Sequence, residues 1–228
     1  MRSGGHPSVL NRYLNHDDTK EQQAGYAVLG TLKGEAVVAR LAGDLKRVKA
    51  GRFPPALHLD VLNAAKRQGA PELMTLLKGM PEPIAEAAML SGGDAIRGRN
   101  LLLGHSGGQC LVCHTFDGVG RDVGPALDRV GGRTRESLLQ SLIRPDADLS
   151  EGYGHVSVTL KDGRKLAGFL VEEDQVRLGL RTTDGKVQNV LLVDVVEREP
   201  ARSMMPSMLP ILSRQEIRDV VEFLATQD

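Results

Sequence analysis

The stretch GGQCLVCHTFDGVGRDVGPAL, residues 107–127, contains both cysteines of this 228-residue chain. Cys110 and Cys113 are separated by two residues, and His114 follows the second cysteine directly. The glycines that continue after this motif allow the chain to wrap a bulky object, but they do not permit a long helix. The chemistry of the Cys-X-X-Cys-His motif therefore decides how the rest of the chain is interpreted.

Four kinds of chemistry use a Cys-X-X-Cys pair. A structural disulfide across so short a loop adds only modest stability. A thioredoxin-like redox pair requires a strand before the motif and a helix after it, whereas here a helix is expected before it and glycines follow. A zinc site requires a second ligand pair at suitable spacing, which the sequence does not contain. Only a covalently attached c-type haem accounts for the histidine behind the second cysteine.

A covalent haem gives each residue of the motif a role. The thiols of Cys110 and Cys113 add to the two vinyl groups of the porphyrin, which places His114 under the iron as a ligand. The other ring nitrogen of such a histidine needs an acceptor. The turn at Pro125 is placed to offer its backbone carbonyl, and Leu127 then lies against the ring edge. We expect one covalent haem c per chain.

The iron also needs a sixth ligand or an open face. The segment SMMP supplies two thioethers, Met204 and Met205, and Met208 is a third. Methionine is more often a core residue than a ligand, but these residues lie in a proline-interrupted loop where core packing needs them less. The remaining histidines considered as ligands are His58, His105 and His155, and none is favoured.

The composition argues against other classes of function. Basic and acidic residues balance at 29 each, which argues against broad electrostatic binding to DNA or anionic lipid. The longest apolar runs are far shorter than a membrane-spanning helix requires. We therefore expect no nucleic-acid partner and no membrane span.

Aromatic residues make up only 3% of the chain, which suits a domain whose core is filled partly by a porphyrin. The sequence does not determine the oligomeric state.

The first part of the chain is predicted to be helical. Residues 18–80 contain four segments with apolar residues at helical spacing. Such an array resembles HEAT repeats, although a plain small helical bundle fits four helices equally well. Residues 80–94 contain two prolines and a Ser-Gly-Gly sequence, so we expect a connection into the next domain.

Capping residues predict three helices farther along the chain. Asp94 precedes residues 95–105, and Thr134 precedes a short amphipathic helix that Pro145 stops. Ser213 and Glu216 have the spacing of a capping box before the last helix.

Residues 152–199 differ from their surroundings. They are rich in Val, Leu and Thr and partly alternate, which is typical of strands. Asp162-Gly163 and Asp184-Gly185 are predicted to be hairpin turns. We expect a small antiparallel sheet or barrel of four or five strands, inserted between helical segments.

The motifs GDAIRGRNLLL, CLVCH, VGPAL, SMMP and SRQEIRDVVEFLAT together resemble the class I cytochrome c fold. In that family an N-terminal helix crosses the C-terminal helix where a small residue meets an aromatic one. The resemblance implies that Gly98 and Phe223 meet in this way. The methionine ligand of the family usually precedes a proline, which selects Met205 over Met204.

More narrowly, residues 92–226 resemble the haem-binding domain of planctomycete and verrucomicrobial proteins (Pirellula-type), in which a β-rich block precedes the methionine loop. The matches are VGPALDRVG, RESLLQSLIRPDADLSEGYGHVSVTLKDGRKLAGFL and SMMPSMLPILSRQEIRDVVEFL. A HEAT-like segment often precedes that domain. The resemblance implies a mainly α fold: a helical segment, 1–85, then a cytochrome c domain, 86–228, interrupted by a β insertion, 152–199. Leu102 departs from the family's common aromatic residue, which concerns packing only.

The resemblance implies an electron-transfer protein rather than an enzyme, with His114 and Met205 as axial ligands and no catalytic residue. Its partners would be a dehydrogenase that donates electrons and an acceptor farther downstream. A five-coordinate haem enzyme or gas sensor, and an interaction module with a structural haem, are the alternatives. Thioether attachment takes place outside the cytoplasm, so we expect a periplasmic or otherwise exported protein, although the N-terminal residues do not resemble a signal peptide.

Overall fold

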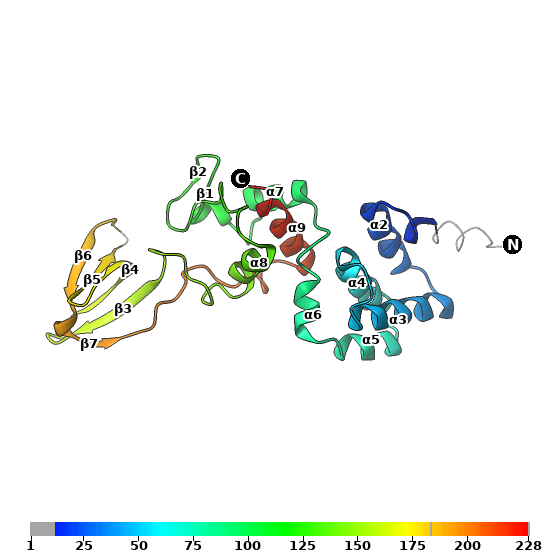
Figure 1. Cartoon of the computed structure of the whole chain (residues 1–228), viewed down its shortest axis with the longest axis horizontal. Helices are drawn as coiled ribbons and strands as arrows, with labels where there is room; N and C mark the ends of the chain where they lie inside the picture. Colours follow the sequence, from blue (N-terminus) through cyan, green and yellow to red (C-terminus); the bar gives the residue numbers. More distant parts are fainter. Residues whose placement is uncertain (1–11, 183, 228) are drawn as a thin grey trace. The chain divides into compact units, whose positions relative to one another are not determined.

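The computed structural model describes residues 12–182 and 184–227. The fold is mixed α/β, with helices, a five-stranded antiparallel sheet and a two-stranded sheet (Figure 1). By packing, the chain divides into two compact units. The first contains the described residues as far as Leu101 together with Ser213–Thr226, and the second contains Leu102–Leu212 and Gln227. None of the described helices is long and apolar enough to cross a membrane.

The first unit is helical, as expected. Its elements are α2 (Thr19–Leu29), α3 (Glu35–Lys49), the short η1 (Pro55–Leu57), α4 (His58–Gln68), α5 (Pro71–Lys78), α6 (Glu82–Ala87), the first part of α7 (Ala95–Gly104), and α9 (Arg214–Leu224). The four helices expected in residues 18–80 are present as α2 to α5. The packing joins α7 and α9 to these helices, whereas the family resemblance assigns them to the haem-binding domain; that domain boundary stays a prediction.

Helix α6 corrects the expectation that residues 80–94 only connect two domains. Pro81 is the N-cap of α6, and a second proline, Pro83, lies in its first turn. Proline is tolerated there because the first backbone N–H groups of a helix have no intrahelical partner. The two prolines therefore begin a helix instead of excluding one.

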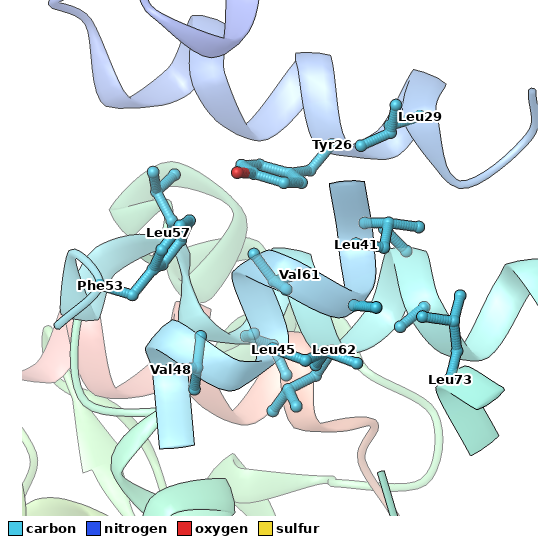
Figure 2. Packing of buried hydrophobic residues seen from close by; sticks show 14 of the residues in the cluster. Tyr26, Leu29, Leu41, Leu45, Val48, Phe53, Leu57, Val61, Leu62 and Leu73 are labelled. Carbon is cyan, nitrogen blue, oxygen red and sulfur yellow. The ribbon is translucent and has the colours of Figure 1, made fainter. Parts of the chain in front are cut away.

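Apolar side chains from α2 to α5 form the core of the first unit (Figure 2). This core includes the side chains of Tyr26, Leu29, Leu41, Leu45, Val48, Val61, Leu62 and Leu73, all at most 8% exposed. The Tyr26 hydroxyl donates to Asp44 (2.9 Å), which also accepts from Arg40 (2.7 Å). Burial and the Asp44 carboxylate raise the pKa of Tyr26. The core thus explains the helical spacing of the apolar residues.

Helices α7 and α9 cross at Gly98. A Cβ atom at this position would overlap the carbonyl oxygen of Asp219 and lie 2.8 Å from Cβ of Phe223. The expected meeting of Gly98 and Phe223 is therefore present. Asp94 caps α7 as predicted, because its carboxylate accepts from the backbone N–H groups of residues 96 and 97. Arg97 donates to the buried Asp219 carboxylate (2.9 Å), which ties the two helices further.

Helix α9 is also tied to α4. Arg218, only 1% exposed, donates to both carboxylate oxygens of Asp60 at 2.8 and 3.2 Å. Ser213 and Glu216 form the capping box that the sequence predicts. The last helix is thus an integral part of the first unit.

The β insertion of the second unit is a five-stranded sheet. Its strands are β3 (His155–Leu160), β4 (Lys165–Glu173), β5 (Arg177–Arg181), β6 (Val187–Leu191) and β7 (Val195–Arg198). Their order is β6-β5-β4-β3-β7, and every neighbouring pair is antiparallel. Alternate residues of β3 and β5, with Val190, form its apolar core. The predicted turn at Asp162-Gly163 joins β3 to β4, and that at Asp184-Gly185 lies between β5 and β6.

Of the two forms expected, a small antiparallel sheet or a barrel of four or five strands, the structure shows the sheet: it is open, and the barrel is not formed. The short η3 (Leu192–Asp194) alone connects the two edge strands, β6 and β7. The end of β6 and the start of β7 are four residues apart, and four Cα–Cα steps of about 3.8 Å are short for a link across a flat five-stranded sheet, so the sheet must curl strongly. Within the described residues, however, β6 and β7 form no hydrogen-bonded ladder, so the sheet does not close.

Candidate haem-attachment site

The Cys-X-X-Cys motif forms a single tight turn. The short helix η2 spans Cys110–Val112, and the carbonyl of Cys110 accepts from the backbone N–H groups of Cys113 (3.1 Å) and His114 (2.9 Å). The structure describes both thiols as free; Cys110 is half-buried and Cys113 is exposed. Burial raises the pKa of the Cys110 thiol. The turn therefore holds the two cysteines and the histidine together without a disulfide.

His105 shapes the approach to this turn. It directly follows α7, and its Nδ1 accepts from the N–H groups of Gly107 (3.2 Å) and Gly108 (2.8 Å). Gln109 then adopts a left-handed conformation (φ 42°), which is uncommon for a residue other than glycine. His105 thus lies at the end of α7, and its ring organises the loop before Cys110.

The imidazole of His114 is oriented by the turn at Pro125. Its Nδ1 lies 2.6 Å from the carbonyl oxygen of Pro125, the acceptor that the sequence predicts. Because a carbonyl can only accept, Nδ1 of the ring is the nitrogen that donates here, and in the neutral imidazole the lone pair is then on Nε2. Within the described residues, Nε2 makes no hydrogen bond. The ring is thus prepared to bind a metal through Nε2.

Gly124 provides the space for this ring. A Cβ atom at Gly124 would lie 2.7 Å from Cε1 and 2.9 Å from Nδ1 of His114. The N–H groups of Val123 (2.9 Å) and Gly124 (2.6 Å) donate to the carbonyl of Cys113. The segment after the motif therefore folds back onto the motif, with its glycine against the imidazole.

A small hairpin, which the sequence did not lead us to expect, returns the chain after His114 to the Cys-X-X-Cys motif. Strands β1 (Thr115–Phe116) and β2 (Val119–Gly120) pair through a turn in which Asp117 (φ 51°) and Gly118 (φ 72°) are both left-handed. An Asp-Gly pair between apolar residues is the usual signal for such a turn, so the signal was present. The backbone of Leu127 then donates to Thr115 (2.9 Å), which places half-buried Leu127 beside the hairpin.

A hollow of about 620 Å³ adjoins Cys110, within the usual range for small-molecule and cofactor sites. It lies between the end of α7, η2 and β2, and His114 is not part of its lining. Three lining side chains are apolar and exposed: Leu103 (39%), Val112 (51%) and Val119 (59%). Apolar surface is therefore uncovered beside the first cysteine.

The methionines lie in a separate loop. Met204 is 61% exposed and Met208 is buried at 4%. Met205 is half-buried, and its N–H donates to the hydroxyl of Ser203 (3.1 Å). Direct contacts thus join Cys110, Cys113, His114 and Pro125. Leu127 is held at Thr115, the residue after His114, and Met205 lies in a loop of its own.

The other histidines have structural surroundings. His58 is buried in the first unit, with Nε2 2.9 Å from the carbonyl of Phe53. His155 begins β3, and its ring meets that of Phe169 edge to face, with 5.7 Å between the ring centroids. Over the part of the chain that the structure describes, no three His, Cys, Asp or Glu side chains are grouped to hold a metal ion. A haem requires no such group, because the porphyrin supplies four ligands.

No protein-family model matches this chain, and no curated protein matches it.

Proposed function

We propose that the chain is a monohaem c-type cytochrome that carries single electrons, with His114 and Met205 as axial ligands. The observation that supports this most is the imidazole of His114, held at Nδ1 by the Pro125 carbonyl, with Nε2 left for a metal. The two free thiols on the same turn fit covalent attachment. The missing side chain at Gly124 makes room for the His114 ring, and the hollow beside Cys110 offers apolar surface next to the first cysteine.

A haem held in this way supplies a reversible one-electron change at its iron. The residues of the chain bind and tune it without proton transfer, so no catalytic acid or base is required. The Pro125 carbonyl holds the imidazole of His114. If Met205 bound the iron of a haem, its thioether would favour the reduced state and would raise the potential relative to two histidine ligands. Electron partners, a dehydrogenase and a downstream acceptor, would dock weakly and transiently. The proposal implies an exported protein.

The variant Met205→Ala tests the sixth ligand. We expect covalent haem to be retained, while the weak far-red absorption band of methionine-ligated ferric haem disappears. The reduced variant should bind carbon monoxide readily, because the sixth position is open, and its potential should fall. Absorption spectra with and without carbon monoxide, and a redox titration, provide the measurements.

Met204→Ala is the matched control, since Met204 is the exposed neighbour of Met205. It should keep the far-red band and bind carbon monoxide poorly. Loss of the band in Met204→Ala alone would assign the ligand to Met204. A wild-type protein that already lacks the band and binds carbon monoxide would favour the five-coordinate enzyme or sensor. Unchanged partner binding by Met205→Ala at a lowered potential would favour the interaction module.

A further inference from the structure

The loop that carries Met205 is hydrogen-bonded to the C-terminal end of α8 (Arg135–Ile143). The N–H of Met208 donates to the carbonyl of Leu142 (2.8 Å), and the hydroxyl of Ser207 donates to the carbonyl of Ile143 (2.8 Å). These are carbonyls of the last helical turn, which have no intrahelical partner. The end of the methionine loop is thus docked on the end of α8.

The beginning of the loop is hydrogen-bonded to Asp146, three residues after the end of α8. The N–H of Ser203 donates to Oδ1 of Asp146 (2.6 Å). His155 and Arg202 exchange two backbone hydrogen bonds, at 2.8 and 2.9 Å. The two segments that lead into and out of the β insertion therefore pair with each other, and we call this pairing the stem.

Met205 lies between two residues of the loop that are held by hydrogen bonds, Ser203 and Ser207. Ser203 precedes it by two residues and Ser207 follows it by two, while Pro206 restricts the backbone between them. Among the described contacts of the loop, the one with Asp146 has a carboxylate as its acceptor. Hydrogen bonds with a charged partner are stronger than neutral ones. The backbone two residues before Met205 is therefore held by an exposed carboxylate that lies 57 residues away in the sequence.

We propose that Asp146 is a positioning residue for the sixth ligand, because it holds the backbone of the methionine loop at Ser203. This inference rests on the proposed function, in which Met205 binds the iron. Without the carboxylate, the start of the loop is released and Met205 leaves the iron more often. An external ligand that replaces methionine binds more tightly in proportion to that open fraction.

Imidazole binding to the ferric, haem-loaded protein measures this open fraction. We expect Asp146→Ala to bind imidazole about two- to fivefold more tightly than wild type, because solvent weakens the hydrogen bond of the exposed Asp146 carboxylate. The amide hydrogen of Ser203 should also exchange faster, a readout that does not depend on the iron. Asp146→Asn keeps an acceptor oxygen and should restore most of the wild-type behaviour.

Asp148→Ala is the matched control. Asp148 is an exposed carboxylate two residues away that pairs with Arg133 (3.1 Å) rather than with the methionine loop. It should leave imidazole affinity and Ser203 exchange unchanged. If Met205→Ala opens the sixth position but Asp146→Ala binds imidazole like wild type, the inference about Asp146 is wrong and the proposed function stands. If the matured wild-type protein carries no haem, or Met205→Ala changes nothing, both are wrong.

Discussion

Replacing Gly124 by alanine is expected to disrupt the haem site. The new Cβ would lie 2.7 Å from Cε1 of the His114 ring, closer than such atoms approach in proteins. The ring cannot simply move aside, because Nδ1 is held by the Pro125 carbonyl at 2.6 Å. We expect His114 to lose this orientation, and the yield of protein with a histidine-ligated haem to fall about tenfold or more, as for other residues that orient a metal-binding histidine.

Gly132→Ala separates this effect from a general cost of losing glycine. Gly132 lies in the same unit, and a Cβ there would meet nothing within 4 Å. It should give wild-type haem content and spectra. Haem content per polypeptide and the absorption spectrum of the reduced protein provide the measurements. Normal haem content and histidine ligation in Gly124→Ala would show that the ring does not occupy the place described.

Replacing Gly98 by alanine is expected to have the largest effect on stability. The added methyl group would overlap the carbonyl oxygen of Asp219 in α9, and backbone atoms cannot yield as a side chain can. Overpacking costs typically about 1–3 kcal/mol, and the overlap with backbone atoms puts this variant at the upper end of that range, against a gain in helix propensity of about 1 kcal/mol. We therefore expect a net loss of about 2 kcal/mol or more in the free energy of unfolding, measured by denaturant titration of the helical circular-dichroism signal.

Gly104→Ala is the control within the same helix. A Cβ at Gly104, at the end of α7, would meet nothing within 4 Å. It should be neutral or slightly stabilising, because alanine favours a helix more than glycine does. Equal stabilities of the Gly98 and Gly104 variants would exclude the close crossing of α7 and α9.

The features that were predictable from the sequence are those with local causes. Asp94, Thr134 and Ser213 each cap the helix that follows, because a short polar side chain satisfies backbone groups a few residues away. The Pro125 carbonyl was expected from the need of His114 for an acceptor, and both lie within one short segment.

The features that escaped the sequence interpretation have other causes. In α6 the same prolines that mark a break also begin a helix, so the local signal is ambiguous. Closure of the sheet depends on pairing between its first and last edges, which no short stretch of sequence specifies. The contact of Asp146 with Ser203 joins residues 57 positions apart, and no pattern in the sequence around either residue predicts it. Such contacts follow only once the chain has folded.

The most direct test of the central claim is the mass of the denatured protein. The chain should be produced with an export signal in cells that attach haem, and then unfolded in acid before mass spectrometry. Covalent attachment at Cys110 and Cys113 predicts a mass higher than that of the polypeptide by about 616 Da, one haem. Replacing both cysteines by alanine should abolish the gain. A wild-type chain at the mass of the bare polypeptide, colourless and with free thiols or a disulfide, would contradict the account.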